Sequence, residues 1–156
     1  MNIAENIHRF RSELPEGVKL IAITKTKPNE DILEAYHAGH KMFGENKVQE
    51  LVSKYEALPK DIEWHMVGHL QSNKVKYIAP FVHLIHGVDR SKLFQVIDKE
   101  GRKNNRVIDI LMQFHIAGEE TKFGFDLQEA KELLDSETFK NYEFIKVKGV
   151  MGMATD

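Results

Sequence analysis

The sequence has 156 residues, of which 42% are hydrophobic and 29% charged, and its formal net charge is −2. This composition predicts one globular domain over residues 1–156, and the well-mixed charges provide no basic surface for nucleic acid. The chain has no cysteine, which excludes disulfides and thiolate metal sites. No apolar run reaches the ~20 residues that cross a bilayer, and the N-terminus has no signal-peptide pattern, so we expect a cytoplasmic protein without membrane contact.

Short apolar runs rich in β-branched residues alternate with stretches whose apolar residues are spaced by three and four. A leading helix is expected over about residues 2–14, and helical spacing recurs, for example, at Ile32, Leu33 and Tyr36. Strands that alternate with helices indicate parallel βαβ units. The predicted strands are Leu20–Thr24, Lys41–Phe43, Trp64–Val67, Leu84–Val88, Val107–Ile116 and Phe144–Val150.

Several helix starts carry capping signals. Asn46 with Gln49, and Asp126 with Glu129, have the spacing of capping boxes. Single polar residues also precede helical stretches and are expected to act as N-caps. These are Asn29, Ser72, and either Asp89 or Ser91.

Two α/β architectures fit this alternation. A doubly wound sheet usually has a glycine-rich phosphate-binding turn after its first strand, but the turn here, Thr24–Pro28, has no glycine. A β/α barrel instead gathers functional residues at the C-terminal ends of several strands, and polar groups follow five successive strands here. The prediction is therefore a (β/α)8 TIM-type barrel, of which this sequence supplies about six βα units.

Lys25 directly follows the first predicted strand, and strand alternation places it on the same face as Ile21 and Ile23. Lys27 lies two residues further, and Pro28 favours an extended conformation there, so both amines can point the same way. A second cation and partial desolvation both lower the pKa of an amine, and a neutral amine attacks aldehydes. The simpler alternative is a pair of solvated loop lysines.

Other strand ends carry polar groups with less specific interpretations. Asn46 can contact the ring of a ligand, cap a helix, or do both. His65 and His69 are not a metal pair in an extended strand, because four residues span about 13 Å, so no metal site is expected. His65 is instead expected to pack inside the barrel with one ring nitrogen hydrogen-bonded. Glu120 or Lys122 can face the pocket, but a solvated loop is the preferred interpretation.

Four segments at successive strand ends together resemble one family, the pyridoxal phosphate homeostasis proteins, which share the alanine racemase N-terminal barrel. The resemblance covers nearly the whole chain, and the combination of segments is far more specific than any one of them. The segments are Ile21–Pro28, Phe43–Asn46, Trp64–Lys74 and Lys148–Met153.

The resemblance implies that the protein binds pyridoxal 5′-phosphate (PLP) as a Schiff base on Lys25, with Asn46 beside the cofactor ring. Lys27, His65 and Met153 are expected around the same cofactor. The family has no established catalytic turnover, so the implied role is PLP homeostasis, with no catalytic residue assigned. Apo forms of PLP-dependent enzymes are the expected partners, and the full-length protein is expected to be a monomer.

The sequence departs from the family in length. Family members continue with two further βα units that bind the cofactor phosphate, and barrels of this type place phosphate sites after strands seven and eight. We therefore expect residues 1–156 to be a C-terminally incomplete barrel that holds PLP poorly on its own.

Three other functions compete with PLP homeostasis. One is a PLP-dependent amino-acid racemase or decarboxylase, although none of the four tyrosines falls at a strand C-terminus where a second acid/base is needed. Another is an aldolase that uses Lys25 directly on a sugar carbonyl. The last is an inert barrel that acts through protein partners.

Overall fold

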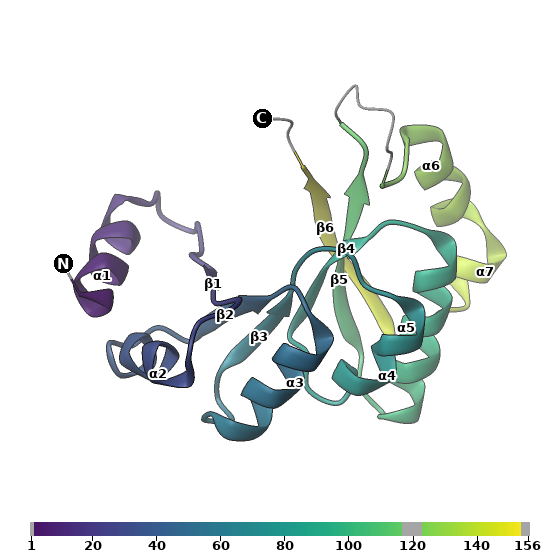
Figure 1. Cartoon of the computed structure of the whole chain (residues 1–156). Coiled ribbons are helices and arrows are strands. Elements are labelled where there is room, and N and C mark those ends of the chain that lie inside the picture. The colour runs from purple at the N-terminus through teal and green to yellow at the C-terminus, as the bar shows by residue number, and fades with distance from the viewer. Residues whose placement is uncertain (1, 117–122, 154–156) are drawn as a thin grey trace.

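The computed structural model describes residues 2–116 and 123–153 of the chain. Six strands form one sheet in which all pairings are parallel, as the sequence predicted (Figure 1). The strands are β1 (Ala22–Ile23), β2 (Met42–Glu45), β3 (Glu63–Met66), β4 (Leu84–Val88), β5 (Ile108–Phe114) and β6 (Ile145–Gly152).

Helices connect successive strands, and Figure 1 shows α3 to α7 following one another along one side of the sheet. None of the helices in the described part of the chain has the length and apolarity needed to span a membrane. The helices are α1 (Ile3–Glu13), α2 (Asn29–His37), α3 (Val48–Ala57), α4 (Val75–Ile78), α5 (Ser91–Lys103), α6 (Leu127–Asp135) and α7 (Glu137–Lys140), with a 3₁₀ turn, η1, at Ser72–Lys74.

The strands lie in the order β1-β2-β3-β4-β5-β6, so each strand pairs with its neighbours in sequence. This order is that of a β/α barrel and differs from the doubly wound order, in which the sheet grows in two directions from its first strand. Among the described residues, β1 and β6 are the two outer strands, and the sheet is open between them.

The hydrophobic core lies between the sheet and the helices. Phe43, Trp64 and Met66 point from β2 and β3 towards the helices and are at most 1% exposed. Burying one such side chain contributes roughly 1.5–3 kcal/mol, which fixes the helices against this face. The opposite face, called the inner face below, is more open: Ile23 on β1 is 48% exposed. Other fully buried members of the core include Leu51, Ile78, Ile85, Leu93, Phe94, Ile97, Ile108 and Ile110.

The helix caps match the sequence predictions only in part. Asp126 and Glu129 form the predicted capping box at the start of α6. The predicted box of Asn46 with Gln49 is wrong, because β2 runs through Glu45 and the N-cap of α3 falls on Lys47. With the helix starting one residue later, Gln49 is no longer at the third position. The predicted single caps at Asn29, Ser72, Asp89 and Ser91 are also wrong, because the N-cap positions fall on Pro28, Gln71 and Arg90, without side-chain cap bonds.

Candidate functional site

A buried polar network lies where β1 and β2 end. The Thr24 hydroxyl donates a hydrogen bond to the Glu45 carboxylate, and both residues are buried. Burial raises the pKa of the Glu45 carboxyl above its usual value, although hydrogen bonds from Lys54 and Thr24 act in the opposite direction. A buried carboxylate is costly without partners, so this position requires a cation nearby.

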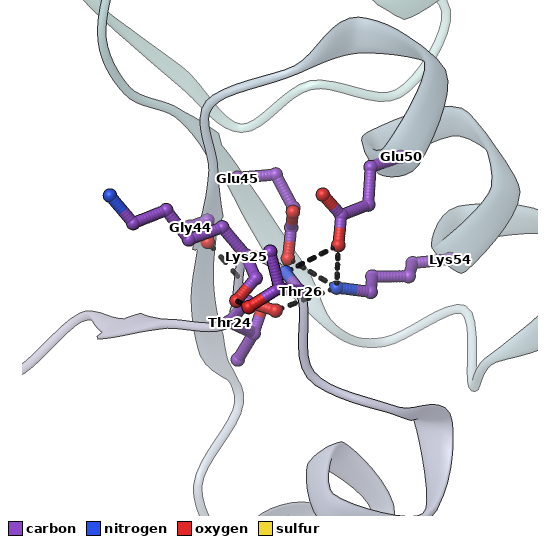
Figure 2. Close-up of polar contacts among 7 residues, drawn as sticks. All are labelled: Thr24, Lys25, Thr26, Gly44, Glu45, Glu50 and Lys54. Atoms are coloured by element: carbon purple, nitrogen blue, oxygen red, sulfur yellow. Dashed lines mark hydrogen bonds and ion pairs between the residues drawn. The ribbon is translucent and has the colours of Figure 1, made fainter.

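Lys54 on α3 is that cation. Its ammonium group donates to the Thr24 carbonyl at 2.7 Å, to Glu45 Oε2 at 2.7 Å and to Glu50 Oε2 at 2.9 Å (Figure 2). An ammonium group has three donors, and each of them has an acceptor here. The side chain of Lys54 is only 6% exposed. Lys54 therefore ties the end of β1, the end of β2 and helix α3 to one another.

The network also sets the turn that follows β1. Thr26 has a φ of 65°, in the left-handed region that residues with a Cβ seldom adopt. Its backbone N–H donates to Glu50 Oε2 at 2.7 Å, which holds the turn in this conformation. The hydrogen bond from Lys54 keeps the pKa of Glu50 below its usual value, so the acceptor stays ionised. Both sides of Lys25 in the chain are thus fixed, at Thr24 and at Thr26.

Lys25 itself takes no part in the network. Figure 2 shows its side chain pointing away from Glu50 and Lys54. The residue is exposed, and no carboxylate among the described residues lies within 4.0 Å of its amine. A primary amine without a counter-ion, on a fixed turn at the C-terminal end of a strand, is suited to condense with a carbonyl group.

Asn46 follows β2 and is also free to bind a ligand. It lines a cavity of about 520 Å³ between α3 and the segment after β3. The structure shows no hydrogen bond from its side-chain amide to another described residue, and the amide does not cap α3. A Cβ added at Gly68 would lie 3.6 Å from Asn46 Cβ, so the segments that follow β2 and β3 run close to each other here. The other lining residues are Lys47, Val48, Gln49, Val52, His69, Gln71, Lys74 and Tyr77.

His65 lies on the inner face, one strand beyond Gly44, with which it pairs in register. It is 4% exposed, and its Nδ1 lies 2.9 Å from His86 Nε2, which confirms the expected single hydrogen bond. The pKa of His65 is lowered to about 3, mainly by burial and to a smaller extent by the nearby His86, His83 and Lys19. The imidazole is therefore neutral at physiological pH.

The other predicted residues are more dispersed. Lys27 is exposed, and its backbone N–H donates to the Thr24 carbonyl at 3.0 Å. Met153 follows β6 and is 61% exposed. Lys25 follows β1 and Met153 follows β6, which are the two outer strands of the described sheet. His69 lies 3.8 Å from Asp89, apart from the interior His65. Glu120 and Lys122 lie outside the described residues.

The network beneath Lys25 was not predicted from the sequence. One signal was present, because Glu50 and Lys54 are four residues apart on one helix face. A second signal was Glu45, because an acidic residue at the end of an apolar strand is unusual. Their connection to Thr24 depends on the parallel pairing of β1 with β2, which a single sequence does not specify.

Known proteins share the fold of this chain. Residues 1–155 match the family model described as "Alanine racemase, N-terminal domain". The solved alanine racemase from E. faecalis is 15% identical, and its TM-score of 0.74 over 96% of this chain and 41% of its own shows a shared fold. The fold is thus the α/β fold of the alanine racemase N-terminal domain, as predicted.

Proteins of higher sequence identity show to which family the chain belongs. A pyridoxal phosphate homeostasis protein of Aquifex aeolicus is 47% identical over 86% of this chain and 64% of its own length. One from Vibrio alginolyticus is 35% identical over 97% of this chain and 71% of its own. The structure of PipY from Synechococcus elongatus solved with PLP bound has a TM-score of 0.87 and 33% identity, covering 98% of this chain and 71% of PipY. The chain belongs to the family of the pyridoxal phosphate homeostasis proteins, and it spans about two thirds of these relatives.

Proposed function

We propose that this chain binds PLP covalently through Lys25 and serves intracellular PLP homeostasis. The observation that carries the proposal is the Lys25 amine, which has no carboxylate partner among the described residues and stands on a turn fixed by buried Lys54. The family supports it, because relatives are named for PLP homeostasis and PipY was solved with PLP bound.

The residues present fit this cofactor. PLP supplies an aldehyde, and its condensation with the Lys25 amine forms a Schiff base and releases one water molecule. The free carboxamide of Asn46 can donate to or accept from a ring substituent. Lys27 adds a positive charge beside an anionic ligand. His65 lies on the inner face of β3 and not in the turn that carries Lys25. Met153 follows β6, the outer strand at the other edge of the described sheet.

The wider role is part of the same proposal. We propose that the full-length protein is a cytoplasmic monomer that supplies PLP to apo enzymes and catalyses no reaction of its own. A racemase needs a second acid/base beside the cofactor. Tyr36 donates to Asp61 at 2.7 Å and Tyr55 stacks on Phe81 with centroids 3.9 Å apart, so neither phenol stands beside Lys25.

Borohydride trapping tests the proposal. The chain is mixed with excess PLP, because the expected phosphate-binding segments lie outside this sequence, and is then reduced and examined by intact-mass and peptide mass spectrometry. One pyridoxyl group is expected, on Lys25. Lys25→Ala should abolish the adduct, whereas Lys27→Ala, the matched neighbouring variant, should slow or weaken binding and retain it. A pyridoxyl group found on Lys27 in the wild-type chain would overturn the assignment.

A further inference from the structure

A second group of potential ligands lies on the inner face, near the N-terminal ends of β3 and β4. Glu63, His65 and His83 each contribute one donor atom, and the three atoms lie within 4.8 Å of one another. His83 Nε2 is 3.6 Å from Glu63 Oε2, and the rings of His65 and His83 have centroids 5.2 Å apart. Glu63 and His83 lie at the N-terminal ends of β3 and β4, whereas His65 is in register with Gly44 and Ile23, two residues before Lys25.

Strand geometry produces this cluster. Glu63 and His65 are two residues apart in β3, so alternation puts both side chains on the inner face. His83 directly precedes β4, and its backbone N–H donates to the Trp64 carbonyl at 2.8 Å, which places it beside β3. The three residues are therefore brought together by strand pairing and not by a spacing visible in the sequence.

His65 is oriented as a metal ligand would be. Its Nδ1 is 2.9 Å from His86 Nε2, and when Nδ1 is the donor, Nε2 carries a lone pair. Nε2 is buried and has no hydrogen-bond partner among the described residues. The two nitrogens of an imidazole point in different directions, so Nε2 is directed away from His86. Metal-binding histidines commonly have their second nitrogen held in this way by a neighbouring group.

We propose that Glu63, His65 and His83 form a binding site for a divalent transition metal of the zinc class. Two imidazoles and one carboxylate are a ligand set that Zn²⁺ accepts, with a fourth position left for water. Mg²⁺ and Ca²⁺ prefer oxygen ligands and fit this set poorly. Ligand atoms around tetrahedral Zn²⁺ are about 3.3 Å apart. The side chains of Glu63 and His83 are 41% and 45% exposed, so they can rotate to close the remaining gap while His65 stays fixed.

Metal titration of the PLP-free chain tests the site. After removal of metal with EDTA and dialysis, calorimetry with Zn²⁺ should show one equivalent bound with micromolar or better affinity. Co²⁺ should give the intense visible absorption of a four-coordinate ion, which scattered surface histidines do not produce. His83→Gln and Glu63→Gln, both at partly exposed positions, should each weaken Zn²⁺ binding more than about tenfold.

Three controls make the result specific. His8→Gln removes an exposed histidine on α1 and should leave binding unchanged. His86→Gln should weaken binding about tenfold while one equivalent is still bound, because it removes only the orienting partner of His65. Lys25→Ala should bind Zn²⁺ normally, which separates this site from the PLP site. Absence of stoichiometric Zn²⁺ binding, or equal binding by wild type, His83→Gln and Glu63→Gln, would show that the cluster is only a structural pairing of side chains.

Discussion

The buried ammonium group of Lys54 donates hydrogen bonds to three acceptors. These bonds fix the turn that carries Lys25, so the position of Lys25 depends on Lys54. A lysine suits this place because its ammonium is a compact charge with three donors, whereas the planar guanidinium of arginine presents its donors in a fork. The acceptors come from Thr24, directly after β1, from β2 and from α3. A cation at this point therefore offsets the burial of Glu45 and also shapes the turn.

Removal of the Lys54 charge should destabilise the folded protein. In Lys54→Met the Glu45 carboxylate stays buried without its counter-ion, and we expect the free energy of unfolding to fall by about 3–5 kcal/mol. Urea denaturation measures this loss. Lys131→Met, at an exposed lysine of α6, is the matched control and should change stability by less than about 0.5 kcal/mol. Addition of Glu45→Gln to Lys54→Met should restore part of the loss, and failure of Lys54→Met to exceed the control would contradict this role.

The helices α3 and α6 differ in how they begin, although their sequences predicted the same capping box. In α6 the Asp126 carboxylate accepts from the Glu129 N–H at 2.8 Å, and the Glu129 carboxylate accepts from the Asp126 N–H at 3.1 Å. In α3 the N-cap position falls on Lys47, without a side-chain cap bond. The amide of Asn46 is consequently left for a ligand.

A pair of alanine variants distinguishes the two helix starts. Asp126→Ala should lower the free energy of unfolding by about 1 kcal/mol, because it leaves helix N–H groups unpaired. Asn46→Ala should cost less than about 0.5 kcal/mol, since no cap is lost, but should weaken PLP binding under the proposed function. Thermal or urea denaturation measures the first effect and borohydride trapping the second. An equal loss of stability in both variants would mean that Asn46 does cap α3.

The sequence predicted which strands and helices exist better than it predicted the residues at which they begin and end. Hydrophobic runs located all six strands, and β4 matches its predicted bounds at Leu84–Val88. The predicted C-terminal end of β2, Phe43, falls two residues before the observed end, Glu45, and the N-cap of α3 falls on Lys47 instead of Asn46. Lys25 drew attention because it directly follows a predicted strand, and its assignment to the cofactor came from the resemblance to the family and stays a prediction. Its support by Lys54, 29 positions away in sequence, and the approach of His83 to Glu63 depend on strand pairing, which local pattern does not encode.

Across the whole molecule, two buried histidines, His40 and His65, and the partly buried His86 give the stability a definite pH dependence. Burial holds the pKa values of His40, His65 and His86 below the usual value, so the folded protein binds fewer protons than the unfolded chain. Their contribution to stability is complete above the unfolded pKa of about 6.5 and is lost as the pH falls below it. For His65 the loss continues down to its folded pKa of about 3.

Urea denaturation at about pH 7.5 and about pH 5.5, with EDTA present, measures this slope. Each of these histidines should lower the free energy of unfolding by up to about 1.4 kcal/mol per pH unit below its unfolded pKa. His40→Gln should make the slope shallower, whereas His8→Gln, at an exposed position, should leave it unchanged. Buried Glu45, whose pKa is raised, acts in the opposite direction, so the difference between variants is the quantity to compare. A slope that His40→Gln does not alter would contradict the assignment of His40.

The sequential strand order also affects how the chain can fold during its synthesis. In a sheet ordered β1 to β6, every strand after the first pairs with a strand that has already been synthesised. As the chain leaves the ribosome N-terminus first, each new βα unit can dock on the one before it without waiting for a distant segment. Each pairing joins neighbouring βα units, as between Ala22 and Phe43 or between Ile110 and Val147, so no strand has to pair with a remote part of the described chain. Among the described strands the two longest, β5 with 7 residues and β6 with 8, come after the other four in sequence, so their extensive pairing forms on strands that are already in place.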